Sequence, residues 1–158
     1  MVVILIKRIT LHIKIDKKAY NQYAAEFFID DKPLSEILGI DRNSLAFIDN
    51  DINSFYYKKK QQSKSIVKDY IEQCIGKKNP FNQFNSNRLV LYRCHCGCDY
   101  CGVISCRLNI KENIVIWEDV RYENEDNDDA MKIKNINDIS FEKKQYMSEF
   151  EKILQQNE

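Results

Sequence analysis

The sequence predicts an α+β fold, in which an antiparallel β-sheet with a cysteine-rich hairpin packs against two or three helices. Three patterns lead to this prediction. Apolar and polar residues alternate over 9–15, which is the period of a half-buried strand. The stretch 89–120 is dense in β-branched and aromatic residues, as strands are. Two other stretches, 58–78 and 140–154, repeat their apolar residues at helical spacing instead.

Length and composition indicate one globular domain over residues 1–158. Of the 158 residues, 44% are hydrophobic and 11% aromatic, which is enough to form a core. The 24 basic and 24 acidic residues cancel, so no overall charge attracts nucleic acid or a membrane surface. The apolar start is too short for a signal segment, and no run reaches the ~20 residues of a membrane span. We therefore expect a cytoplasmic protein whose thiols stay reduced unless they hold a metal or do redox chemistry.

The N-terminal part predicts two strands and a short helix. The alternating strand over 9–15 is followed by an aromatic-rich one over 23–29. The turn at 30–33 then opens a helix, with an aspartate capping the first amides and the proline in the first helical turn. Gly39 ends this helix. Residues 40–57 fit either a strand or a packed loop.

The stretch 58–78 predicts an amphipathic helix with a basic outer face. It holds seven lysines against two acids, and it ends at Gly76. A polar loop over 79–87 separates this helix from the strands that follow. The apolar residues that recur at helical spacing are Ile66, Val67, Tyr70, Ile71 and Cys74.

A three-stranded antiparallel meander and a last helix complete the predicted fold. The three strands cover residues 89–93, 103–110 and 114–120. Residues 111–113 suit a hairpin loop, and the seven acids and one arginine of 118–129 predict a solvated acidic loop. Ser140 can cap the last helix. Its apolar residues follow at i, i+4, i+7 and i+8, and they are Tyr146, Phe150, Ile153 and Leu154.

The segment 94–102 is the main candidate for a functional site. Four of the six cysteines fall within eight residues there, together with two of the four glycines. If 97–100 is a hairpin turn, Cys96 faces Cys101 and Cys94 faces Val103, because side chains alternate along paired strands. Three sulfurs then share one face, and a cysteine in the turn can swing towards them. This set predicts a structural Zn²⁺ held by four thiolates, those of Cys94, Cys96, Cys98 and Cys101.

Alternatives to this zinc site remain open. His95 and Cys106, which have the opposite strand parity, are substitute ligands. The thiols can also be inert, half-buried side chains. A third interpretation is a redox dithiol, formed by Cys101 with either Cys98 or Cys96, although thioredoxin-like motifs lie at a helix N-terminus. Cys74 lies on the apolar stripe of a predicted helix, so we expect it in the core.

The rest of the chain offers no catalytic constellation, which favours a non-enzymatic protein. The only histidines are His12, on the polar face of a strand, and His95. Four glycines cannot build a Gly-x-Gly-x-x-Gly or P-loop phosphate site here. The acids of 123–129 lack the frame of an EF-hand calcium loop.

The cysteine segment resembles the centre of a widespread, uncharacterised bacterial family of small proteins. That centre reads Cys-x-Cys-Gly-x-x-x-Cys, followed by a Trp-x-Asp strand and a C-terminal Phe-x-x-x-Gln-Tyr helix. The matching parts here are Cys94, Cys96, Gly97 and Cys101, then residues 116–119 and 141–146. The resemblance implies the fold and no reaction. By analogy, such families can include toxin-neutralising immunity proteins.

Two oppositely charged stretches and many aromatic residues favour a protein that binds a partner. We expect an intracellular partner-binding protein of the immunity type, which recognises a basic toxin domain by charge complementarity. The alternative is a zinc-binding or thiol-redox protein that acts through the segment from Cys94 to Cys101. The residues expected to contact the partner are Glu123, Glu125, Asp126, Asp128 and Asp129.

Overall fold

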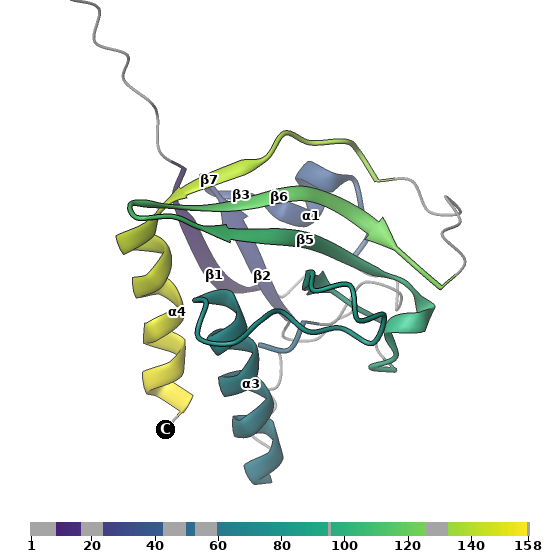
Figure 1. Cartoon of the computed structure of the whole chain (residues 1–158), viewed down its shortest axis with the longest axis horizontal. Coiled ribbons are helices and arrows are strands. Elements are labelled where there is room, and N and C mark those ends of the chain that lie inside the picture. Colours follow the sequence, from purple (N-terminus) through teal and green to yellow (C-terminus); the bar gives the residue numbers. More distant parts are fainter. Residues whose placement is uncertain are drawn as a thin grey trace, which may run out of the picture.

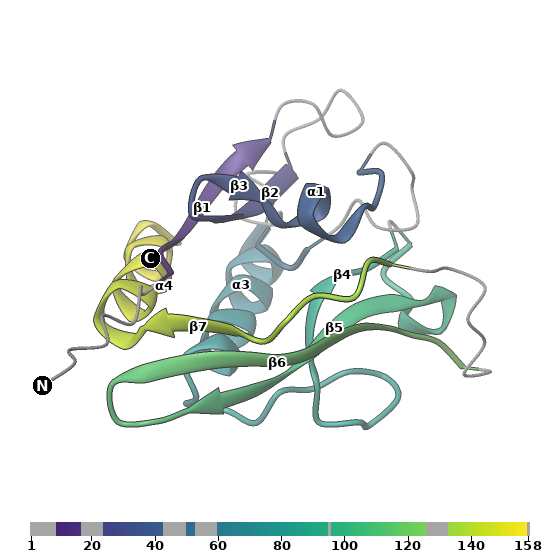
Figure 2. The same cartoon turned by 90° about the horizontal axis from the view of Figure 1, so that it is seen from above.

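The structure, a computed structural model, confirms an α+β fold (Figure 1). It describes residues 9–16, 24–42, 50–52, 60–94, 96–125 and 133–157. Within this part of the chain, seven strands form two antiparallel sheets, accompanied by three α-helices. Seen from above, one layer holds the three-stranded sheet and α1, and the other holds the four-stranded sheet (Figure 2). None of the helices described here is long and apolar enough to cross a membrane.

The three-stranded sheet has the order β1 (Leu11–Asp16), β2 (Ala24–Ile29) and β3 (Lys32–Pro33). Its strands agree with the predicted ones, because alternation places Leu11 and Ile13 in the core. The turn before β3 uses Asp30 and Asp31 at φ 48° and 67°, a left-handed conformation that Asp tolerates. Neither residue caps the following helix, so that part of the prediction is wrong. Asp30 instead accepts the Thr10 N–H at 3.0 Å.

Helix α1 (Leu34–Leu38) follows β3 directly. Pro33 occupies its N-cap position, and no side chain bonds its first amides. The helix ends at Gly39 as predicted, because φ 71° at that residue suits glycine best. Of the ambiguous segment 40–57, the structure describes residues 40–42 and 50–52, which lie outside helices and strands.

The four-stranded sheet has the order β4 (Leu89–Tyr92), β5 (Val103–Ile110), β6 (Ile114–Glu123) and β7 (Ile139–Glu142). Its first three strands confirm the predicted meander. The fourth strand is not predicted by the sequence patterns, and the expected helix cap at Ser140 is wrong, because Ser140 lies within this strand. The predicted acidic loop over 118–129 is wrong as far as Glu123, since β6 pairs with β5 up to that residue.

Helices α3 (Lys60–Cys74) and α4 (Lys143–Asn157) pack against each other beside the sheets (Figure 1). Their predicted apolar stripes are confirmed except at Ile66, which is 46% exposed. Tyr146 of α4 donates its hydroxyl to the Cys74 carbonyl at 2.9 Å and accepts the Trp117 indole N–H at 3.2 Å. These two hydrogen bonds connect both helices to β6.

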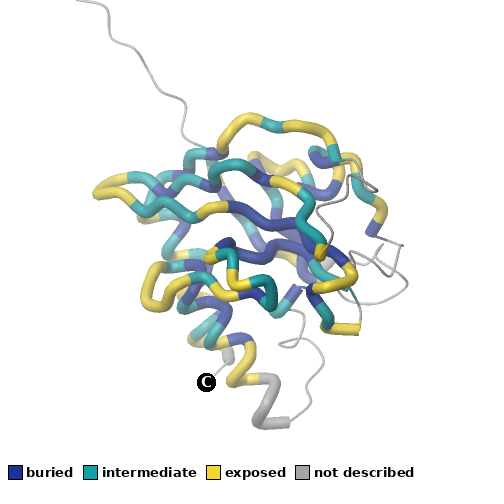
Figure 3. The backbone as a smooth tube through the Cα atoms, turned by 45° about the vertical axis from the view of Figure 1, so that its right-hand side comes forward, coloured by how far each residue is buried: buried dark blue, intermediate teal, exposed yellow. Residues whose placement is uncertain are grey.

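One hydrophobic core contains residues from both sheets and from the inner sides of the helices (Figure 3). Trp117 on β6 is fully buried at its centre. Its ring makes T-shaped contacts with Phe27 of the other sheet at 5.3 Å and with Phe141 at 4.9 Å between centroids. Such contacts stabilise a core by about 0.5–1.5 kcal/mol each beyond area burial.

Candidate metal centre

The cysteine segment connects β4 to β5, and it folds as two tight turns. The strand ladder ends at Tyr92 opposite Ile104, after an irregularity between Val90 and Tyr92. Gly97 then donates its N–H to the Cys94 carbonyl at 2.9 Å, and a 3-10 helix covers Asp99–Cys101. The predicted pairing of Cys96 with Cys101 and of Cys94 with Val103 in a continuous ladder is therefore wrong. The irregularity changes the register, and the turns replace the ladder.

These turns nevertheless bring together the three sulfurs that strand parity predicted. The sulfur of Cys96 lies 3.4 Å from that of Cys94 and 3.5 Å from that of Cys101. All three sulfurs lie within 4.8 Å of one another. Tetrahedral Zn²⁺ with Zn–S bonds of ~2.3 Å needs sulfurs about 3.8 Å apart, so small shifts give this geometry. The three cysteines are free, and their separations exceed the ~2.05 Å of a disulfide bond.

The other predicted ligands lie elsewhere or outside the described residues. The sulfur of Cys98 is not part of the group, although its backbone N–H donates to the Cys96 sulfur at 3.4 Å. Cys106 is fully buried on β5 opposite Leu89, so it is no substitute ligand. His95 lies outside the described residues. Cys74 is buried in the core, as expected.

The hydrogen bonds within the group make its thiols unequal. The Cys98 N–H, followed by the Cys94 and Cys101 thiols, lowers the pKa of Cys96. The neighbouring thiols of Cys96 and Cys94 raise the pKa of Cys101 to about 12. Burial raises the pKa values of Cys74 and Cys106. The Cys96 thiol therefore ionises more readily than the Cys101 thiol, and the two core thiols stay protonated.

Gln83, in the loop before β4, holds the second turn in place. Its backbone N–H donates to the Asp99 carboxylate at 2.9 Å, and its side-chain oxygen accepts the Asp99 N–H at 2.8 Å. Its side-chain amide also donates to the Gly97 carbonyl at 3.3 Å, and its own carbonyl accepts the Tyr100 hydroxyl at 3.2 Å. No local sequence pattern indicates this role, because it depends on a contact between residues 16 positions apart.

Two arginines flank β4, the strand that leads into the cysteine segment. Arg93 lies 3.4 Å from Asp51 and 3.7 Å from the buried Asp99. Arg88, 3% exposed, donates to the Ser105 hydroxyl at 2.9 Å and pairs with Asp119 at 3.2 Å. This second arginine supports the irregular pairing of β5 with β6.

The acids proposed to bind a partner do not form a patch within the described residues. Glu123 accepts hydrogen bonds from the hydroxyls of Ser86 at 3.1 Å and Ser105 at 3.2 Å, so it is tied into the sheet. Glu125 is exposed. The other three residues of that set, Asp126, Asp128 and Asp129, lie outside the described residues.

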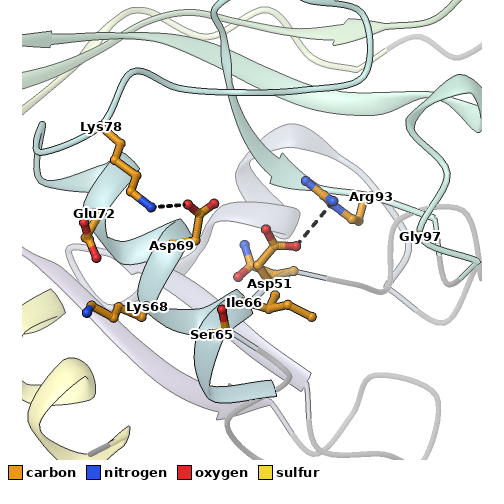
Figure 4. Close-up of a pocket in the computed structure, with 10 residues that line it drawn as sticks. Asp51, Ser65, Ile66, Lys68, Asp69, Glu72, Lys78, Arg93 and Gly97 are labelled. Atoms are coloured by element: carbon orange, nitrogen blue, oxygen red, sulfur yellow. Dashed lines mark hydrogen bonds and ion pairs between the residues drawn. The ribbon is translucent and has the colours of Figure 1, made fainter. Parts of the chain in front are cut away.

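A cavity of about 820 Å³ opens beside the segment, between α3 and the end of β4 (Figure 4). Arg93 and Gly97 line its side nearest the cysteines, and Asp69 pairs with Lys78 at 2.7 Å on the opposite side. An added Cβ at Gly97 would meet nothing within 4 Å. The cavity thus reaches the cysteine segment at a residue without a side chain.

Fold and site together define an α+β protein with a candidate centre of three thiols between two strands. Comparisons of this chain with protein-family models, curated proteins and solved structures give no match. The resemblance to the bacterial Cys-x-Cys-Gly-x-x-x-Cys family therefore stays a prediction from the residues that carry it.

Proposed function

We propose that the protein binds Zn²⁺ through the thiolates of Cys94, Cys96 and Cys101. The observation that carries this proposal is the grouping of their sulfurs, all within 4.8 Å of one another. Thiolates are the ligands that soft and borderline ions such as Zn²⁺ prefer. The ion would crosslink both turns of the 94–102 segment, which otherwise has little core to hold it, since Cys96 and Cys101 are exposed.

The test is the zinc content of protein purified without chelator. We expect about one zinc per chain, and we expect Cys96→Ser to lose it because this sulfur contacts both others. Cys106→Ala is the matched control, since it also removes one thiol but from the buried face of β5. Zinc below ~0.2 per chain, with the three thiols titrating freely, would refute the proposal.

Partner binding of the immunity type is the second proposed function. It is supported by two large apolar side chains at the surface, Phe81 at 62% exposure in the loop before β4 and Tyr100 at 50% exposure within the cysteine segment. Aromatic side chains are enriched among residues that dominate binding energy. The test is whether the neighbouring gene encodes a basic toxin domain and whether co-expression of this chain restores growth. No rescue by the wild-type chain would reject this function, and equal rescue by Tyr100→Ala would remove its structural support.

A further inference from the structure

The three cysteines of the candidate metal centre lie at or near the protein surface. Cys96 and Cys101 are exposed, and Cys94 is half-buried. Within the described residues, no histidine, carboxylate or fourth cysteine joins the group. The nearest acid in sequence, Asp99, is 1% exposed and engaged with the Gln83 N–H and Arg93. Because Zn²⁺ in proteins is normally four-coordinate, the described group leaves one position to fill.

Cys98 is held in an arrangement that serves the cluster through its backbone. Its N–H donates to the Cys96 sulfur at 3.4 Å, and its carbonyl accepts the Cys101 N–H at 3.3 Å. Both ends of this residue are thus fixed by the two turns. Its sulfur lies outside the group in this arrangement.

The cavity next to Gly97 offers room and charge for an external ligand. Its volume is about 820 Å³, and it is lined by equal numbers of cationic and acidic side chains. Figure 4 shows Arg93 reaching towards Asp51 at one end and Lys78 towards Asp69 at the other. Paired charges of both signs match a zwitterionic, peptide-like molecule better than a simple anion. The six charged residues are Asp51, Lys68, Asp69, Glu72, Lys78 and Arg93.

We propose that the fourth ligand of the Cys94–Cys96–Cys101 zinc centre is the thiolate of a small peptide-like thiol, whose charged ends lie in this cavity. The inference rests on the zinc site proposed above. On binding, the external thiol releases its proton to solvent, and its sulfur replaces a water on the ion. No electrons are exchanged in this step. The protein would then be a zinc-dependent receptor for thiol peptides, with an open metal position of the kind that structural zinc sites lack.

The experiment uses the full chain loaded with Co²⁺, whose visible spectrum reports the number of sulfur ligands. Reduced glutathione is the probe, and 2-mercaptoethanol is the control thiol without charged ends. We expect a three-sulfur spectrum for the loaded protein, and a change to a four-sulfur spectrum when glutathione is added. S-methylglutathione, which lacks a free thiol, should leave the spectrum unchanged. Glutathione should bind more tightly than 2-mercaptoethanol because only glutathione reaches the charged cavity.

Two variants test the cavity and the fourth ligand separately. Lys78→Gln, at an exposed position, should weaken glutathione binding about twofold to fivefold and leave 2-mercaptoethanol binding unchanged. Cys98→Ser should keep both the metal and the response to glutathione. A four-sulfur spectrum before any thiol is added, lost in Cys98→Ser, would overturn this inference but leave the zinc site standing.

The remaining outcomes are equally decisive. Equal affinity for glutathione and 2-mercaptoethanol, unaltered in Lys78→Gln, would overturn the assignment of the cavity. Absence of any spectral response to glutathione would overturn the external ligand. Failure of the wild-type protein to bind either Co²⁺ or Zn²⁺ would refute the proposed function, and this inference with it.

Discussion

Replacing Gly102 with alanine should lower the free energy of unfolding more than the same replacement at Gly97, the other glycine of the cysteine segment. Gly102 has φ 107°, a region that is nearly restricted to glycine and costs about 2 kcal/mol for other residues. An added Cβ would also overlap the Tyr122 hydroxyl and would lie 2.5 Å from the Tyr122 ring. Relieving such an overlap costs about 2 kcal/mol more, since Tyr122 must move on its strand. The expected loss is therefore about 4 kcal/mol, a large part of the ~5–15 kcal/mol of a typical domain.

Urea unfolding followed by tryptophan fluorescence measures this loss, and Gly97→Ala is the matched control. Gly97 also has a positive φ, 77°, but an added Cβ there would meet nothing within 4 Å. We expect Gly97→Ala to lose only about 1 kcal/mol, the cost of the left-handed backbone. The double variant Gly102→Ala with Tyr122→Ala should recover the overlap part of the loss. Equal losses in both single variants would refute the close packing of the segment against β6.

Three further expectations concern the surroundings of the site. Gln83→Ala should weaken zinc binding about tenfold in a chelator competition, as losses of supporting hydrogen bonds around a metal site do, while the zinc count at saturation stays the same. Lys78 lowers the pKa of Asp69 below 3.8, so the stability from this pair is complete above pH 3.8 and is lost as the pH falls through the folded pKa. Lys78→Gln should raise the Asp69 pKa measured by NMR titration, and an unchanged value would contradict the ion pair. Ile71→Ala should lower stability by about 2–5 kcal/mol in thermal unfolding, whereas Ile66→Ala should change it by less than about 0.5 kcal/mol.

Most of the fold could be predicted because its patterns are local. Strand β5 and its hairpin loop with β6 follow from alternation and turn residues alone, and the stripe of α4 follows from its helical period. Strand β7 could not be found this way. It has four residues and passes directly into α4, so its pattern merges with that of the helix.

The acidic end of β6 shows why charge alone is a poor guide to loops. Strand β6 continues through Tyr122 and Glu123 because these residues pair with Ile104 and Val103, which are distant in sequence. The Glu123 carboxylate then receives hydroxyl donors from two other segments. A carboxylate with such partners fits within a sheet, but its partners are known only once the chain is folded.

The sequence predicts which residues form the candidate site, but it does not predict the turns that bring them together. Strand parity grouped Cys94, Cys96 and Cys101, and the structure groups them through a turn and a 3-10 helix instead. Both arrangements bring these residues together because the connection between β4 and β5 is short. The support from Gln83 and the cavity at Gly97 depend on tertiary packing, so no local pattern indicates them.

Trp117 gives the protein a built-in reporter of assembly. It is the only tryptophan of the chain, and its ring contacts Phe27 of the other sheet and Tyr146 of α4. Its emission therefore registers whether the two sheets and the last helix are joined in one core. Separation of the sheets would expose the indole to water and shift its emission to longer wavelength, even if each sheet kept its own strands. A shift of this kind with unchanged strand content thus indicates loss of the common core.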